Sequence, residues 1–133
     1  MTPELKILFD RARDAQAKAY APYSRFQVGA ALRAASGAVH AGCNVENAAY
    51  PVGACAEAGA ISAMLLAGDR QIAEILVIGD GPELCTPCGA CRQRLREFSA
   101  DTMMVHVAGP EGLRRSFSLG SLLPHSFGPD NLA

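Results

Sequence analysis

The sequence has no run of about 18 consecutive apolar residues, the length that a membrane-spanning helix needs. It also has no cluster of lysine and arginine residues, and its formal net charge is −1, so no broad basic surface for nucleic acid is expected. The first residues, MTPELKILFDRARDAQ, mix charges among the apolar positions and do not resemble a secretory signal. We therefore predict a cytoplasmic protein that binds neither membranes nor nucleic acid.

No internal repeat, low-complexity segment or linker interrupts the 133 residues. Half of the residues are hydrophobic and 19% are charged, which is typical of globular proteins. Because this length suits one hydrophobic core, we predict a single domain over residues 1–133.

Hydrophobic periodicity predicts the secondary structure. A helix is expected over 3–19, ended by the proline in APYS at 21–24, and segment 46–53 is expected to form a loop. The remaining elements are strands at 26–34 and 38–45, a helix at 55–68, a strand at 73–80, a helix at 88–98, strands at 102–109 and 113–119, and a short helix at 119–123. This order predicts an α/β three-layer sandwich, with a central mixed five-stranded sheet flanked by helices.

The chain has five cysteines, an odd number that cannot pair completely in disulfides. Cys88 and Cys91 stand three positions apart in CTPCGACRQ, in the first turn of a predicted helix, so both sulfurs can approach one metal ion. Cys55 should cap another predicted helix, with Glu57 two residues later. Three thiolates leave one of the four positions around zinc for water, which characterises a catalytic zinc site. A carboxylate beside such a water is a candidate general base.

Other interpretations stay open on these residues alone. A CxxC pair also occurs in thioredoxin-like proteins and in structural zinc sites. A structural-zinc binding module would need a fourth ligand, and the candidates are Cys85, Cys43, His40, His106 and His125. We expect Cys43 in the core, Cys85 in a loop, and the histidines in structural or solvated positions.

The segments CAE at 55–57 and PCGACRQ at 87–93 resemble the zinc-dependent cytidine deaminases. YAPYSRFQVGAAL at 20–32, GCNVENAAYP at 42–51 and LLPHSF at 122–127 resemble the same family in the same order, so nearly the whole chain is covered. The likeness is to the short, homotetrameric form. It implies a cytidine deaminase-like fold, one Zn²⁺ per chain, and a role in pyrimidine salvage.

The resemblance implies that Cys55, Cys88 and Cys91 bind zinc and that Glu57 moves protons while cytidine or deoxycytidine is hydrolysed to uridine or deoxyuridine and ammonia. It also implies a set of substrate-binding residues, some acting across a subunit interface: Phe26, Asn44, Glu46, Ala48, Tyr50, Ala56 and Phe127. In this set Asn44 and Glu46 would hold the ribose hydroxyls. Composition alone favours core positions for the two phenylalanines and a turn at NVEN.

The chain departs from the family pattern after Glu57. Family members commonly carry an arginine there, which donates to the zinc-bound sulfurs, whereas this chain has Ala58. We expect helix amides and Arg92 to offset the thiolate charge instead. Because of this departure, an alternative stays open: the chain could be a relative that deaminates another cytosine nucleoside, such as blasticidin S. A polynucleotide editor is the less favoured class, because it would want a basic surface and usually a histidine in place of Cys55.

Overall fold

The structure is a computed structural model that describes all of residues 1–133. Its elements, in chain order, are α1 (Pro3–Gln16), β1 (Val28–Ala34), β2 (Val39–Cys43), the 3₁₀ helix η1 (Tyr50–Val52), α2 (Ala56–Leu66), β3 (Ile72–Gly79), α3 (Gly89–Glu97), β4 (Met104–Gly109), β5 (Gly112–Ser118), α4 (Leu119–Leu122) and the 3₁₀ helix η2 (Pro129–Leu132). None of the helices is both long and apolar enough to span a membrane.

The five strands form one mixed sheet in the order β2-β1-β3-β4-β5. Strand β1 is antiparallel to both β2 and β3, so β2 and β3 run in the same direction, and β3 and β4 pair in parallel. Helix α2 therefore connects β2 to β3 and helix α3 connects β3 to β4, both as crossovers between strands of one direction. Crossovers of one hand place their helices on the same face of the sheet.

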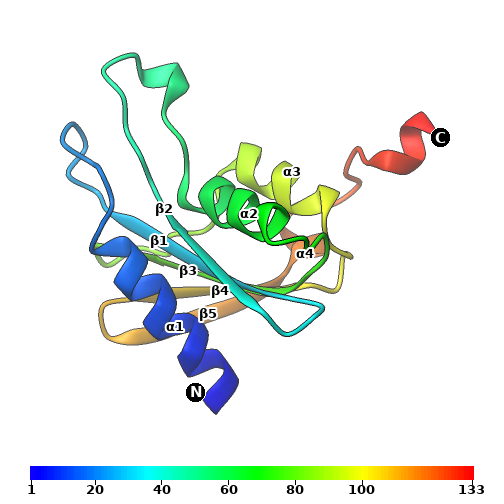
Figure 1. Cartoon of the computed structure of the whole chain (residues 1–133), viewed down its shortest axis with the longest axis horizontal. Helices are drawn as coiled ribbons and strands as arrows, with labels where there is room; N and C mark the ends of the chain where they lie inside the picture. Colours follow the sequence, from blue (N-terminus) through cyan, green and yellow to red (C-terminus); the bar gives the residue numbers. More distant parts are fainter.

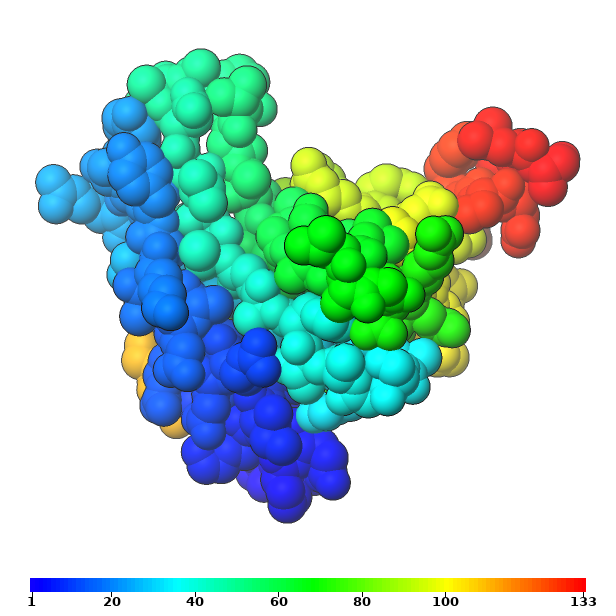
Figure 2. Space-filling model, viewed as in Figure 1, coloured from blue at the N-terminus to red at the C-terminus, as the bar shows by residue number.

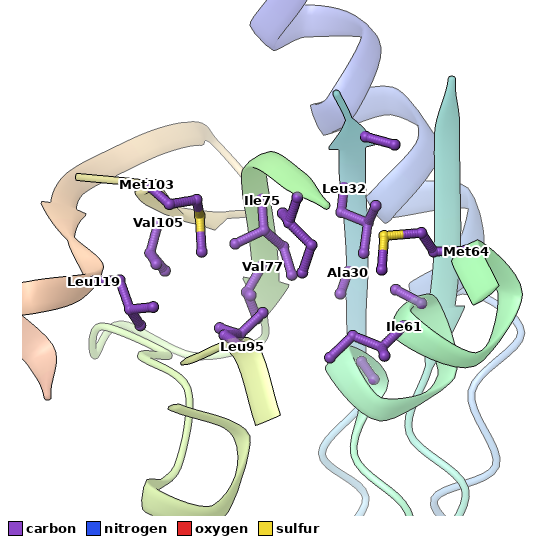
Figure 3. Close-up of a cluster of buried hydrophobic side chains, with 14 residues drawn as sticks. Ala30, Leu32, Ile61, Met64, Ile75, Val77, Leu95, Met103, Val105 and Leu119 are labelled. Carbon is purple, nitrogen blue, oxygen red and sulfur yellow. The ribbon is translucent and has the colours of Figure 1, made fainter. Parts of the chain in front are cut away.

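Helices cover both faces of the sheet, which confirms the predicted three-layer arrangement (Figure 1). Helix α1 packs on one face through Leu8, Phe9 and Ala12 against Leu76 and other strand residues. Helices α2 and α3 pack on the other face. The larger core cluster lies there, with Ile61, Met64 and Leu95 on the helices facing Leu32, Val77 and Val105 on the strands (Figure 3).

The close packing of α2 on β2 depends on Gly42. A Cβ atom at this position would lie 2.4 Å from the backbone nitrogen of Ala60 and 2.6 Å from the carbonyl oxygen of Ala56. Only glycine lets the helix backbone approach the strand this closely. This contact positions the first turn of α2, which carries Glu57.

The predicted elements are confirmed in type and order, but several ends differ. The first helix ends at Gln16 rather than residue 19, because the next amides bond three residues back: Lys18 N–H donates to Ala15 and Ala19 N–H donates to Gln16. The alanine stripe therefore continues in the sequence after the backbone has left the helix.

Two segments contain short helices that were not predicted. The predicted loop over 46–53 contains η1, and the C-terminal segment contains η2. Figure 2 shows that the first segment, in teal, projects from the layers of the fold beside the blue segment that precedes β1, whereas the C-terminal segment, in red, projects on its own. Side chains at their tips, such as Tyr50 and Leu132, are among the most exposed large apolar residues of the chain.

Candidate metal centre

Three cysteines from two helices meet at one point. Their Sγ atoms all lie within 4.8 Å of one another, and those of Cys55 and Cys88 are 4.0 Å apart. Cys55 is the N-cap of α2, as predicted. Cys88 is the N-cap of α3 rather than a first-turn residue, and Cys91 lies in the first turn.

The sheet topology explains why these residues meet. Cys55 follows the carboxyl end of β2 and Cys88 follows the carboxyl end of β3, and these two strands run in the same direction. Their connecting helices therefore begin at the same edge of the sheet, where α/β proteins commonly bind ligands. Two helix N-termini point their positive ends at the sulfurs, and this favours thiolates over thiols.

The three thiols differ in their surroundings. Burial raises the pKa of Cys55 and that of Cys91, and the neighbouring acidic groups raise them further. For Cys88, burial acts in the same direction, but hydrogen bonds from the Cys91 backbone and from the Cys91 and Cys55 thiols outweigh it and lower the pKa. Three thiolates this close would repel one another, so all three can be ionised together only when a cation binds between them.

No fourth protein ligand joins the cluster, because the three cysteines alone make up the group. His40 pairs with Asp69 at 2.8 Å, and His106 pairs with Glu74 at 3.0 Å. Cys85 lies in a loop, as expected, whereas Cys43 is half-buried rather than a core residue. Three thiolates with a free fourth position fit zinc in its catalytic form.

Glu57 lies beside the cysteines in a cavity of about 360 Å³, referred to below as the site cavity. Only 4% of Glu57 is exposed, and burial raises the pKa of its carboxyl group above the ordinary value. The residues that line the site cavity include Val28, Asn44, Glu46, Tyr50, Cys55, Ala56, Glu57, Cys85, Thr86 and Cys88. The structure thus places a buried carboxyl group and the sulfurs of Cys55 and Cys88 along one cavity, with Cys91 in contact with both sulfurs.

Asn44 and Glu46 both line this cavity, but each is already engaged in holding the chain. The Asn44 side chain accepts from the Val28 N–H at 2.9 Å and donates to the Phe26 carbonyl at 2.8 Å. Glu46 accepts hydrogen bonds from the Tyr23 and Ser24 N–H groups and from the Ser24 hydroxyl. The Ser24 bonds lower the pKa of Glu46, so its carboxylate stays ionised.

The remaining predicted substrate residues are placed differently. Tyr50 and Ala56 line the site cavity, whereas Phe26, Ala48 and Phe127 do not. Phe26 is 39% exposed rather than buried in the core, and its ring lies near Gly79, as does the side chain of Cys85, which lines the cavity. Phe127 is 57% exposed, and its carbonyl accepts from the Gln93 side chain on α3 at 2.9 Å.

An arginine contacts the cysteines, but not the one expected. Arg92 turns away and donates to the Pro87 carbonyl at 2.7 Å and the Leu122 carbonyl at 2.9 Å. Arg94 instead donates through Nη1 to Cys91 Sγ at 3.4 Å. Its positive charge also lowers the pKa of Glu57, although the effect of burial is larger. The spacing of three residues between Cys91 and Arg94 is compatible with this contact, but Arg92 lies at a similar spacing from Cys88, so spacing alone does not identify Arg94.

Comparisons with known proteins agree with this arrangement. A family model described as the cytidine and deoxycytidylate deaminase zinc-binding region matches residues 3–107. The cytidine deaminase of Sporosarcina psychrophila is 36% identical over 130 residues, which cover 98% of this chain and 96% of that protein. The cytidine deaminase of Mycobacterium tuberculosis strain H37Rv is 39% identical over 127 residues, covering 95% and 91% respectively.

Solved structures of the same kind superpose closely. The crystal structure of cytidine deaminase from Burkholderia pseudomallei matches with a TM-score of 0.87 and 45% identity, covering 96% of this chain and 100% of that one. The crystal structure of the Mycobacterium tuberculosis protein matches with a TM-score of 0.81 and 37% identity, covering 96% and 99%.

Proposed function

This chain belongs to the cytidine and deoxycytidylate deaminase family, and on that premise we propose that it hydrolyses cytidine or deoxycytidine to uridine or deoxyuridine and ammonia, with one zinc ion per chain. The observation that carries the proposal is the meeting of three cysteine sulfurs beside one buried glutamate, with Cys55, Cys88 and Glu57 lining the site cavity. A set of three thiolates without a fourth protein ligand is the ligand pattern of a hydrolytic zinc site.

Cys55, Cys88 and Cys91 hold the metal in this proposal. Bound zinc supplies Lewis-acid activation of the attacking water. Zinc suits the donor set, because thiolates are soft ligands and the cluster offers no oxygen donors that would favour magnesium or calcium.

Glu57 carries the protons. It takes up the proton lost by the attacking water and delivers it to ring nitrogen N3, which makes C4 electrophilic. A C4–O bond then forms. Glu57 takes the second proton from the new C4 hydroxyl group and delivers it to the amino group on C4, so the C4–N bond breaks, ammonia leaves and C4 keeps a carbonyl oxygen. Burial raises the pKa of Glu57, and a carboxyl group whose pKa lies closer to neutrality exchanges protons more effectively.

Asn44 and Glu46 bind the sugar hydroxyls, and Phe26 packs on the pyrimidine ring. The first amides of α2, at Ala56 and its neighbours, have no acceptor within the helix and read the edge of the base. An ionised Glu46 and a fixed Asn44 amide discriminate against ligands that lack hydroxyl groups, since their polar atoms would then lose a partner.

We include a homotetramer with shared active sites in the proposal. Ala48 and Phe127 do not line the site cavity of their own chain, and they lie in the two segments that stand away from the body (Figure 2). Tyr50 is 75% exposed at the tip of one of these segments. These side chains become buried if a neighbouring chain receives them. Sedimentation equilibrium tests this: four chain masses support it, and a stable, active monomer contradicts it.

A cytoplasmic location is also part of the proposal. All five cysteines are free thiols, and the three that hold zinc must stay reduced to do so.

Ultraviolet absorbance of cytidine tests the function directly. The zinc-loaded protein is mixed with cytidine or deoxycytidine, and loss of absorbance is followed together with the ammonia released. We expect one ammonia per uridine formed, loss of the reaction after chelation, and its return with added zinc. A structural-zinc module would leave the absorbance unchanged. Blasticidin S serves as a parallel substrate, although the relatives' names do not favour it.

A further inference from the structure

Arg94 is the only arginine whose side chain donates a hydrogen bond to a cysteine of the cluster. Its Nη1 atom donates to Cys91 Sγ at 3.4 Å, across one turn of α3. The guanidinium of Arg94 takes part in none of the ion pairs of the chain. Its hydrogen bond is therefore made to the sulfur, and its charge also acts on the nearby Glu57 carboxyl group, whose pKa it lowers.

A small residue on the neighbouring helix leaves space beside this arginine. Ala58 on α2 and Arg94 on α3 line the same surface depression between the two helices, together with Glu97. A long side chain at position 58 would compete with Arg94 for this space. Arg92, the other arginine close to the cluster in sequence, is occupied by carbonyl groups elsewhere.

Cys91 has the greatest need for such a donor. Its side chain is fully buried, with 0% exposed, so water cannot solvate a negative sulfur there. Three thiolates with one Zn²⁺ carry a formal charge of −1, and a hydrogen bond from a permanently charged guanidinium offsets it. Hydrogen bonds to metal ligands set both the affinity of the site and the electronic character of the metal.

We propose that Arg94 is a positioning residue of the metal centre, which stabilises the Cys91 thiolate from α3 and thereby supports zinc binding, in place of an arginine from α2. This inference rests on the proposed zinc site. It concerns the affinity for zinc and the character of the Cys91–metal bond, so it can be tested without measuring deamination.

The test compares Arg94→Met with Arg11→Met. Both changes remove one exposed arginine from a helix, but Arg11 lies on α1, on the opposite face of the sheet (Figure 1). Zinc affinity is measured by competition with a chromophoric chelator. We expect R94M to bind zinc about 10- to 100-fold more weakly than the unchanged protein, and R11M to match the unchanged protein. Equal affinity in R94M and R11M would overturn the proposal.

Cobalt spectra separate a hydrogen bond to sulfur from a general structural effect. In the Co²⁺-loaded protein, loss of the donor raises the energy of the sulfur electrons, so the sulfur-to-metal charge-transfer bands of R94M should move to longer wavelength. Bands at unchanged wavelength would contradict the proposal.

Arg94→Lys keeps the charge but not the planar donor, and it should lose less zinc affinity than R94M. If R94K binds zinc as weakly as R94M while both fold, the positive charge is not what matters and the proposal fails. Circular dichroism establishes the folding of each variant. An absence of deamination in the unchanged protein would refute the proposed function, and zinc affinity would still decide the role of Arg94.

Discussion

The Sγ atoms of Cys55 and Cys88 lie 4.0 Å apart, although 33 positions separate the two residues in the chain. Each residue caps a helix that leaves the same edge of the sheet. The metal site therefore depends on how α2 and α3 pack on the strands, and not on either cysteine segment alone.

Replacement of a clustered cysteine should remove the metal. Cys55→Ala leaves two thiolates, which are too few for a stable zinc site, so we expect almost no bound zinc and no deamination. Cys43→Ala is the matched control, because Cys43 lies outside the cluster and should leave one zinc per chain. Metal analysis of the purified variants measures both. A full zinc content in C55A would show that Cys55 is not a ligand.

Glu57→Gln should separate binding from chemistry. The amide has nearly the same shape as the carboxyl group but cannot accept and return the proton, so kcat should fall by about 10² to 10⁴. Zinc content and melting temperature should stay close to those of the unchanged protein, because Glu57 is not among the metal ligands. Glu4→Gln on α1 serves as the control for loss of a glutamate. A nearly normal turnover in E57Q would remove Glu57 from the proposed proton-transfer role.

Gly42→Ala tests whether helix packing sets the site. The added methyl group would meet backbone atoms of Ala56 and Ala60, so α2 must move away from β2. Overpacking of this kind costs about 1–3 kcal/mol in the free energy of unfolding, and backbone atoms cannot yield as side chains do. Urea denaturation measures the loss. Ser62→Ala, an exposed change on the same helix, should stay within about 0.5 kcal/mol of the unchanged protein.

Because α2 carries Glu57 and follows Cys55, the same displacement should lower the zinc affinity of G42A. A variant that loses stability but binds zinc normally would show that the site tolerates movement of the helix.

Much of the fold could be predicted from the sequence, because the hydrophobic patterns of the strands and helices are long and consistent. The cysteine cluster was also predicted, from the spacing of Cys88 and Cys91 and from the position of Cys55 before a helix. Each of these features depends on neighbouring residues along the chain. Element ends were less predictable: the alanines after Gln16 favour a helix in the sequence, but the backbone there forms tighter turns.

The arginine contact could not be chosen from spacing alone. Arg92 follows Cys88 by four residues and Arg94 follows Cys91 by three, so each lies one helical turn beyond a metal-site cysteine. The carbonyl groups of Pro87 and Leu122 decide between them, because they bind Arg92. Leu122 is 30 positions away, so no local pattern reveals it.

Ser24→Ala should weaken the hold on Glu46. The hydrogen bond from the Ser24 hydroxyl is the largest cause of the lowered pKa of Glu46, and the one from the Ser24 N–H is the next. The substitution removes only the hydroxyl, so the pKa of Glu46 should rise toward the ordinary value of 4.5. Carbon-13 NMR of the labelled carboxyl group measures the change. If Glu46 binds the sugar, KM for cytidine should also rise more than kcat falls. An unchanged pKa would mean that the hydroxyl does not contact the carboxylate in solution.

The sign of the stability effect follows from the same shift. A carboxyl group whose pKa is lowered in the folded state stabilises that state above its unfolded pKa, and this contribution is lost as pH falls through the folded pKa. The free energy of unfolding should therefore differ less between pH 7 and pH 3 in S24A than in the unchanged protein. Thermal melting at the two pH values checks this.

Cys85 should react with iodoacetamide slowly and with a steep dependence on pH. It lies half-buried at the wall of the site cavity, and burial raises the pKa of its thiol to about 11. Only the thiolate reacts, so at pH 8 the rate should be about a thousandth of that of the ionised form, and it should rise about tenfold per pH unit up to pH 10.

The zinc-loaded C43A variant isolates this reaction, because Cys85 is then the only thiol outside the metal cluster. Mass spectrometry of the peptide that contains residue 85 gives the rate at each pH. A rate that levels off below pH 9 would show an ordinary, solvent-exposed thiol and would place Cys85 outside the cavity wall. A saturating cytidine analogue should slow the labelling if the bound pyrimidine lies against Cys85. This position is expected because the proposal packs the pyrimidine on Phe26, and the Phe26 ring and Cys85 both lie next to Gly79.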